Sequence, residues 1–116
     1  MRATLAILAF SLAATAAVAQ PSVDRGRWLA QHSCAMCHAI GEQGASPNAA
    51  APPFRELYKR YPIDNLAEAF AEGIVTGHPQ MPEFRLSAGQ TADLLAYLKS
   101  LQRRQHAASG TPAEGN

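Results

Sequence analysis

The chain has 116 residues, with ten lysines and arginines against nine aspartates and glutamates, and a formal net charge of +1 at pH 7. A chain of this length has room for one small domain. The balanced charge and the lack of a basic run give no reason to expect nucleic acid or an anionic membrane surface as a partner.

Residues 1–19 have the pattern of a secretory signal peptide. Arg2 supplies the positive start, an apolar run follows over residues 5–17, and the Ala-Val-Ala sequence ending at Ala19 fits a cleavage site. Cleavage would leave Gln20 as the N-terminus and nine basic residues against nine acidic ones. The run is short and alanine-rich for a membrane span. We therefore expect export to the periplasm without stable membrane insertion after cleavage, with an uncleaved anchor as the alternative.

The first predicted element of the exported chain is a helix over residues 24–39. Ser22 or Asp24 could cap its N-terminus. Gly26 lies inside this helix, where glycine costs about 1 kcal/mol relative to alanine. A close crossing with another helix explains this glycine better than a frayed first turn, so we favour the crossing.

The C-terminal end of this helix carries the sequence Cys34-Ala35-Met36-Cys37-His38, which is the Cys-x-x-Cys-His motif of covalent c-type haem attachment. The two thiols lie three positions apart and can each form a thioether with one haem vinyl group. The adjacent imidazole can then bind the iron. The motif predicts one covalent haem c, attached through both cysteines, with His38 as an axial ligand.

Other interpretations of the motif explain less. A structural zinc site usually has four ligands. The chain has no third cysteine, and its other histidines, at 32, 78 and 106, show no paired spacing. A thioredoxin-like pair needs a βαβ setting, and no strand pattern flanks the motif. A disulfide between Cys34 and Cys37 is possible in an oxidising compartment, but it leaves His38 unexplained. Export agrees with haem, because c-type haem is attached outside the bacterial cytoplasm.

The middle of the chain predicts a loop and two helices. Residues 41–53, which are rich in glycine and proline, form the loop. A short helix over residues 54–61 should end before Pro62. The apolar spacing predicts a second helix over residues 64–76. Its apolar residues are Leu66, Phe70 and Ile74. Gly73 interrupts this pattern, and Gly77 is a plausible C-terminal stop.

The second axial ligand is found among three methionines. Met1 starts the signal peptide, and the geometry that places His38 keeps Met36 off the opposite haem face. Met81 remains, in a loop that flanking prolines stiffen. Two alternatives stay open. Met81 could only fill the core, or His78 could be the ligand instead.

The last predicted helix has the clearest signals. Ser87 and Gln90 form a capping box. The apolar stripe behind it consists of Leu94, Leu95, Leu98 and Leu101, with Tyr97 beside it. Residues 106–116 are small and polar, so we expect a disordered tail. The resulting division is a signal peptide over residues 1–19, one domain over residues 20–105 and a tail over residues 106–116. No segment predicts a strand, and the fold class is all-α.

In this order, the sequence features resemble a class I monohaem cytochrome c over residues 24–103. The features are Gly26, the pentapeptide at residues 34–38, Pro52-Pro53-Phe54, Met81-Pro82 and the segment at residues 94–98. The spacing between the motif and Met81 resembles that of the small bacterial members. The resemblance implies three to four helices wrapped around one covalently bound haem, with the first and last helices crossing near Gly26 and Tyr97.

The resemblance also implies a partner for His38. The carbonyl of Pro52 should accept a hydrogen bond from the second ring nitrogen, a contact that fixes the ring and raises its basicity. Pro53 is the alternative. Three residues could contact haem propionates or only form surface contacts, namely Arg55, Tyr58 and Arg85. Trp28 is expected to pack against the last helix.

Ligation by His38 and Met81 would close both axial positions and raise the reduction potential. Iron without an open position favours electron transfer over catalysis, so the sequence predicts a monomeric, non-enzymatic one-electron carrier. Its partners would be a dehydrogenase, oxidase or reductase, docking briefly over a small interface. The alternatives are a subunit of a larger oxidoreductase complex, and a haem enzyme or gas sensor with a displaceable Met81.

Overall fold

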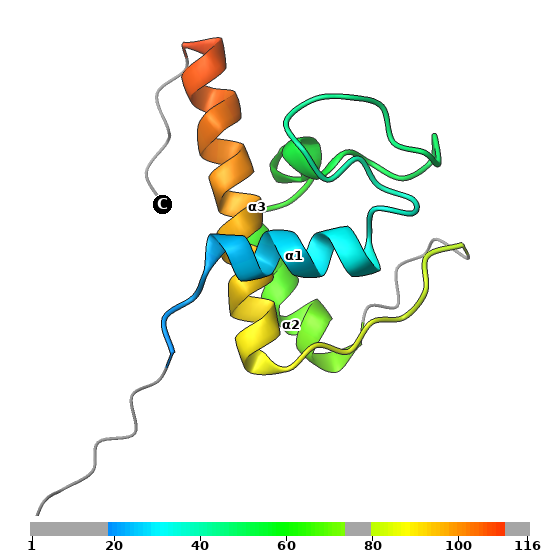
Figure 1. The fold of residues 1–116 in the computed structure, drawn as a ribbon, viewed down its shortest axis with the longest axis vertical. Coiled ribbons are helices and arrows are strands. Elements are labelled where there is room, and N and C mark those ends of the chain that lie inside the picture. Colours follow the sequence, from blue (N-terminus) through cyan, green and yellow to red (C-terminus); the bar gives the residue numbers. More distant parts are fainter. Residues whose placement is uncertain (1–18, 74–79, 111–116) are drawn as a thin grey trace, which may run out of the picture.

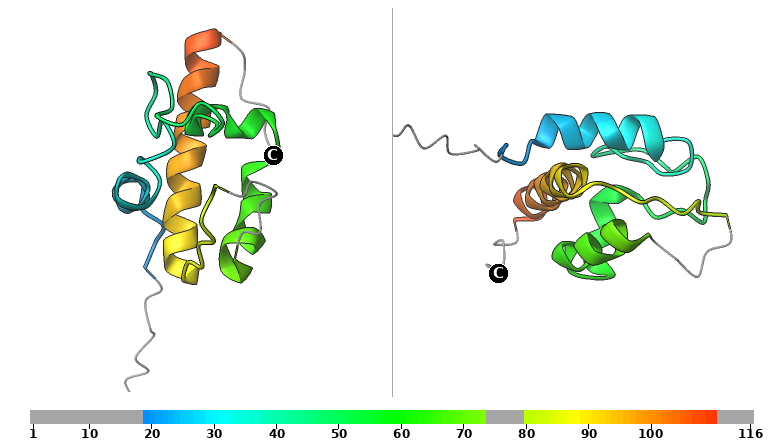
Figure 2. Two further views of the ribbon diagram at one scale, coloured as in Figure 1. Left: turned by 90° about the vertical axis from the view of Figure 1, so that its right-hand side faces the viewer. Right: turned by 90° about the horizontal axis from the view of Figure 1, so that it is seen from below.

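The computed structural model describes residues 19–73 and 80–110. These residues form three α-helices and two short 3-10 helices and contain no strand, which confirms the all-α fold class. The elements are α1 (Val23–Ser33), η1 (Phe54–Lys59), η2 (Ile63–Asn65), α2 (Leu66–Glu72) and α3 (Ala88–Ser109). Figure 1 shows α1 crossing the long helix α3. In Figure 2, α3 lies between α1 on one side and η1 and α2 on the other.

The crossing of α1 and α3 occurs at Gly26, as expected. A Cβ atom built on Gly26 would lie 1.9 Å from the carbonyl oxygen of Asp93 and 2.8 Å from Cβ of Tyr97. Any side chain at this position would therefore force the helices apart. The glycine that weakens α1 locally is what allows the two backbones to touch.

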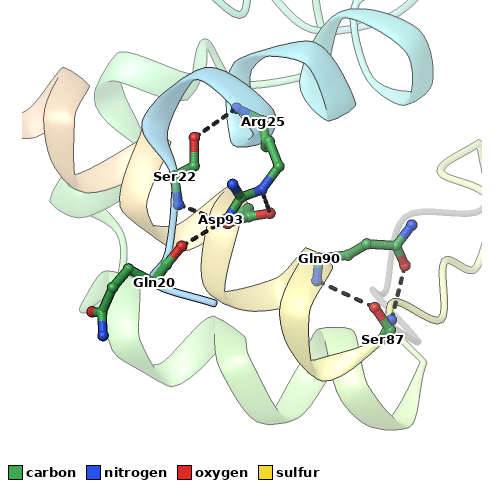
Figure 3. A network of polar contacts seen from close by, with 6 residues as sticks. All are labelled: Gln20, Ser22, Arg25, Ser87, Gln90 and Asp93. Atoms are coloured by element: carbon green, nitrogen blue, oxygen red, sulfur yellow. Dashed lines mark hydrogen bonds and ion pairs between the residues drawn. The ribbon is translucent and has the colours of Figure 1, made fainter. Parts of the chain in front are cut away.

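Polar contacts at the start of α1 reinforce this crossing (Figure 3). Ser22 is the N-cap, and its Oγ accepts a hydrogen bond from the backbone N–H of Arg25. The carboxylate of Asp93 on α3 accepts from Nε of Arg25 at 2.7 Å and from the N–H of Ser22 at 2.7 Å. Arg25 also donates to the carbonyl oxygen of Gln20. The hydrogen bonds from Arg25 and then Ser22 lower the pKa of Asp93.

Helix α3 begins with the predicted capping box. Ser87 Oγ accepts from the N–H of Gln90, and Gln90 Oε1 accepts from the N–H of Ser87 (Figure 3). The predicted stripe is buried, as expected. Its residues Leu94, Leu98 and Leu101 are each 1% exposed and form the centre of the core. Phe54, Leu57, Ile63 and Phe70 cover this stripe from η1, η2 and α2.

The C-terminal end of α3 lies later than predicted. The helix continues to Ser109, so the expectation of a disordered tail from residue 106 is wrong for residues 106–109. Gly110 ends the helix in the left-handed conformation, and its N–H donates to the carbonyl of His106. The ring of His106 lies 5.0 Å from that of Tyr58, which gives the last turn a tertiary contact. Residues 111–116 lie outside the described part of the chain.

Three other element boundaries differ from the prediction. Helix α1 ends at Ser33, not at residue 39, because the chain turns at Cys34, where the N–H groups of residues 34 and 35 share one carbonyl. The predicted helix over residues 54–61 is the 3-10 helix η1. Helix α2 ends at Glu72 because Gly73 adopts a φ of 99°, so Gly73 is the stop instead of an interruption. Gly77 lies outside the described residues.

Candidate haem site

The Cys-x-x-Cys-His motif forms tight turns directly after α1. The carbonyl of Cys34 accepts from the N–H of Cys37 at 3.1 Å and from the N–H of His38 at 2.9 Å. Both thiols are free and half-buried, and burial raises the pKa of the Cys34 thiol to about 11. The turn therefore gathers two thiols and one imidazole within five residues, and it does so without a disulfide.

The imidazole of His38 has a defined orientation. Its Nδ1 lies 2.8 Å from the carbonyl oxygen of Pro52, and its ring centroid lies 5.1 Å from that of Phe54. A carbonyl can only accept a hydrogen bond, so Nδ1 carries a proton, and in the neutral imidazole Nε2 has the free lone pair. Nε2 is the atom that can bind a metal. Pro52, not Pro53, provides this contact, which is the one that the resemblance implies.

The loop after the motif is attached to it on both sides. The N–H of Ala39 donates to Ser46 Oγ at 2.9 Å, and the N–H of Phe54 donates to the carbonyl of Ala39 at 2.9 Å. The N–H of Asn48 donates to the carbonyl of Cys37 at 3.1 Å. These bonds place Pro52 opposite His38, so the orientation of the imidazole is determined by the whole loop.

Met81 lies in the segment that leads into α3. It is half-buried and packs against the hydrophobic core cluster. Figures 1 and 2 show that this segment and the loop after α1 come to the same end of the molecule. The side chain of Asn48 donates to Oε1 of Gln80, the residue before Met81, at 3.1 Å. Sequence reasoning missed this contact. His78, the competing ligand, lies outside the described residues.

Arg55 provides a test of whether the site fits haem. Its Nη1 is buried and has no hydrogen-bond partner in the described part of the chain. A buried guanidinium nitrogen without a partner is costly, and a haem propionate would supply the missing acceptor. Arg85 is exposed and Tyr58 contacts His106, so Arg55 is the residue whose surroundings call for an anion. The donor set present therefore fits haem.

Two other observations bear on the sequence interpretation. Among residues 19–73 and 80–110, no three His, Cys, Asp or Glu side chains gather as a metal site, which gives a structural zinc site no support there. Trp28, which the sequence predicts to pack against the last helix, meets that helix only at its edge, where it lines a surface hollow with Gln90 and Asp93 of α3. Its side chain is 60% exposed and stacks on His32 at a centroid distance of 4.0 Å, because Gly26, Leu29 and Ala30 form the buried face of α1.

Residues 23–102 match the family described as cytochrome c. The chain belongs to the cytochrome c family. It is 31% identical to cytochrome c-552 of Bradyrhizobium diazoefficiens over 102 residues, covering 88% of this chain and 95% of that protein. It is 33% identical to a cytochrome c-553-like protein of Synechocystis sp. over 78 residues, covering 67% and 68% of the two chains.

Family membership confirms the class I monohaem c-type cytochrome and its cofactor, a covalently attached haem c for which Cys34 and Cys37 are the two available thiols. Cytochromes c carry electrons to and from redox partners, so this chain is an electron-carrying haem protein. Among the described residues, no helix has the length and apolar character needed to cross a membrane.

Proposed function

We propose that this cytochrome is a periplasmic one-electron carrier whose haem is bound through Cys34 and Cys37 and ligated by His38 and Met81. Bound haem supplies an iron that alternates between the ferrous and ferric states. The observation that carries the proposal is the hydrogen bond from His38 Nδ1 to the carbonyl oxygen of Pro52. In the neutral ring this bond places the proton on Nδ1, so Nε2 is the nitrogen that can bind iron, and it holds the ring in one orientation, as ligating histidines require.

Met81 is the second ligand in this proposal. Its thioether favours the ferrous state and raises the reduction potential. The packing of Met81 against the core limits the freedom of its side chain, and Pro82 restricts the backbone next to it. With both axial positions held by protein, no position is left for a substrate, which supports a carrier and argues against an enzyme.

Arg55 would bind a propionate. Its buried Nη1 lacks an acceptor among the described residues, and an anionic carboxylate would provide one in a charge-assisted hydrogen bond. Neutralising a propionate charge near the iron is also one way in which a protein sets a potential. We further propose cleavage after Ala19, export, and brief docking of the monomer with a dehydrogenase, oxidase or reductase.

Exchanging the proposed ligand tests the assignment. Axial ligand identity spans about 0.8 V across haem proteins, so Met81→His should lower the reduction potential substantially and remove the weak near-infrared sulfur-to-iron band. His78→Ala is the matched control and should change neither. If the native protein lacks the band, and His78→Ala alters the ligand spectrum while Met81→His does not, the axial ligand is His78 and the proposed ligation is wrong.

Mass spectrometry of periplasmic protein tests export and attachment together. The proposal requires residues 20–116 plus one haem, and the haem should remain after denaturation and acid extraction. A Cys34→Ser variant should keep at most one thioether. Haem that acid extraction releases from the native sequence would contradict covalent attachment.

A further inference from the structure

Asn48 occupies a central place in the polar contacts around the proposed site. Its backbone N–H donates to the carbonyl of Cys37 at 3.1 Å, next to the proposed ligand His38. Its side-chain Oδ1 accepts from the N–H of Ala50 at 3.0 Å. Its Nδ2 donates to Oε1 of Gln80 at 3.1 Å, across a separation of 32 residues. One asparagine thus connects the haem attachment motif to the residue before Met81.

We propose that Asn48 and Gln80 form a latch that holds the Met81 segment against the loop after the motif, and so keeps the thioether of Met81 on the iron. Both are positioning residues, since they act through Met81 and the motif. The inference rests on the proposed ligation by His38 and Met81. It adds a specific device that determines how readily the second axial position opens.

The contacts of the Met81 segment support this role. Among described residues 80–86, two make hydrogen bonds to other parts of the chain. The N–H of Leu86 donates to the carbonyl of Phe70 at 2.9 Å, five residues after Met81. Gln80 makes the other bond, directly beside Met81. Within the part of the chain that the structure describes, Met81 itself is held by apolar packing. Loss of the latch would leave the N-terminal side of Met81 without a polar tether in this part of the chain.

The other end of the latch is well anchored. Asn48 lies in the loop that two further bonds fix to Ala39, one through Ser46 Oγ and one through the N–H of Phe54. Two thioethers would hold the motif itself. The loop therefore provides a fixed point, whereas the segment before α3 is the part that has to move when Met81 leaves the iron.

The expected effect is modest, because both side chains reach solvent and a single hydrogen bond contributes little net free energy there. An external ligand competes with Met81, so its apparent affinity rises in proportion to the population in which Met81 is displaced. Removing the latch should therefore strengthen imidazole binding to the ferric protein by roughly two- to tenfold. Carbon monoxide binding to the ferrous protein should accelerate by a similar factor.

The variants are chosen to separate the latch from general damage. Gln80→Leu removes the acceptor, and Gln80→Glu keeps it. Asn48→Ser retains a hydroxyl that can accept from the N–H of Ala50 but is too short to reach Gln80. Gln43→Ala removes an exposed amide from the same loop and is the matched control. All are measured as holoprotein, by imidazole titration, by carbon monoxide binding and by the near-infrared band.

The latch predicts that Gln80→Leu and Asn48→Ser each tighten imidazole binding, that their double variant goes no further, and that Gln80→Glu and Gln43→Ala match the native protein. Unchanged imidazole affinity in Gln80→Leu, or additive effects in the double variant, would overturn the latch. If the native protein lacks the near-infrared band, both the proposed ligation by Met81 and the latch that depends on it are wrong. If the band is present and the variants behave as native, only the latch is wrong.

Discussion

Replacing Gly26 by alanine should destabilise the folded cytochrome severely. The new Cβ would lie 1.9 Å from the carbonyl oxygen of Asp93, whereas ordinary contact begins at 3.4 Å, so the helices must separate by about 1.5 Å at this point. The obstructing atoms belong to the backbone of α3 and cannot rotate away. Protein interiors are packed too densely to absorb such a shift without loss elsewhere.

The magnitude follows from three contributions. Overpacking costs about 1–3 kcal/mol, and a backbone obstruction belongs at the upper end. Separating the helices also weakens the bond from the N–H of Ser22 to Asp93, which costs about 1 kcal/mol if it is lost, whereas the exposed ion pair of Arg25 adds little. The better helix propensity of alanine returns about 1 kcal/mol. The net loss is about 3 kcal/mol, which for a domain of this size lowers Tm by about 12–24 °C.

Denaturant and thermal unfolding of the holoprotein measure this loss, and Gly89→Ala is the control. Gly89 lies in the first turn of α3, and a Cβ there meets nothing within 4 Å. The same chemical change should therefore leave stability unchanged or raise it by up to about 1 kcal/mol. If Gly26→Ala unfolds at the same denaturant concentration as the native protein, the close crossing does not limit residue size and the reasoning is refuted.

Three further substitutions test contacts of α3. Asp93→Asn should lower stability near neutral pH. Arg25 lowers the folded-state pKa of Asp93, so the ionic contribution to stability is fully present above the usual carboxyl pKa of about 4 and is lost as pH falls through the lowered pKa. The difference in unfolding free energy between the native protein and Asp93→Asn should therefore be smaller at about pH 3 than at neutral pH. A difference that does not change with pH would contradict this assignment. Tyr97→Phe should lower the free energy of unfolding by about 1–3 kcal/mol, because the Tyr97 hydroxyl donates a hydrogen bond to the carbonyl of Ile40 at 2.6 Å. An unchanged denaturation midpoint would show that water replaces the hydroxyl as the donor to this carbonyl. Ser87→Ala should cost about 1 kcal/mol in urea unfolding through loss of the N-cap, whereas Ser87→Asp should retain most of it.

Structural features that depend on residues close together in the sequence were predictable. The Ser87–Gln90 capping box and the leucine stripe of α3 depend on residues three and four positions apart, and both are found in the structure. Gly26 was predictable for a different reason, since an internal glycine that weakens a helix needs a compensating contact. The hydrogen-bond acceptor of His38 was predicted from the family pattern. The spacing between His38 and Pro52 in the sequence does not by itself predict a contact between them.

Features that depend on tertiary contacts were not predictable. Helix α1 ends where the hydrogen bonds of the turn at Cys34 replace those of the helix. The spacing of apolar residues carries no information about this change. The role of Gly73 depends on its positive φ and on the side chain of Glu83, which lies where a Cβ atom of residue 73 would be. Trp28 fits a helical pattern equally well on either face until the buried face is known. The bond between Asn48 and Gln80 joins two amides that no local pattern relates.

The crossing of α1 and α3 has a consequence for the order in which the chain folds. It joins Ser22 to Asp93 across 71 residues, so the main partner of the first helix among the described elements is complete only when nearly the whole domain has been synthesised. Closing a loop of this length has to precede the favourable contacts, and such long-range closure slows folding relative to helical proteins with local contacts. The two cysteines follow directly after α1 and are half-buried in the folded chain. Until α3 arrives, the described contacts of the motif are those with the loop that follows it, which gives attachment chemistry a period of access before the two ends of the domain meet.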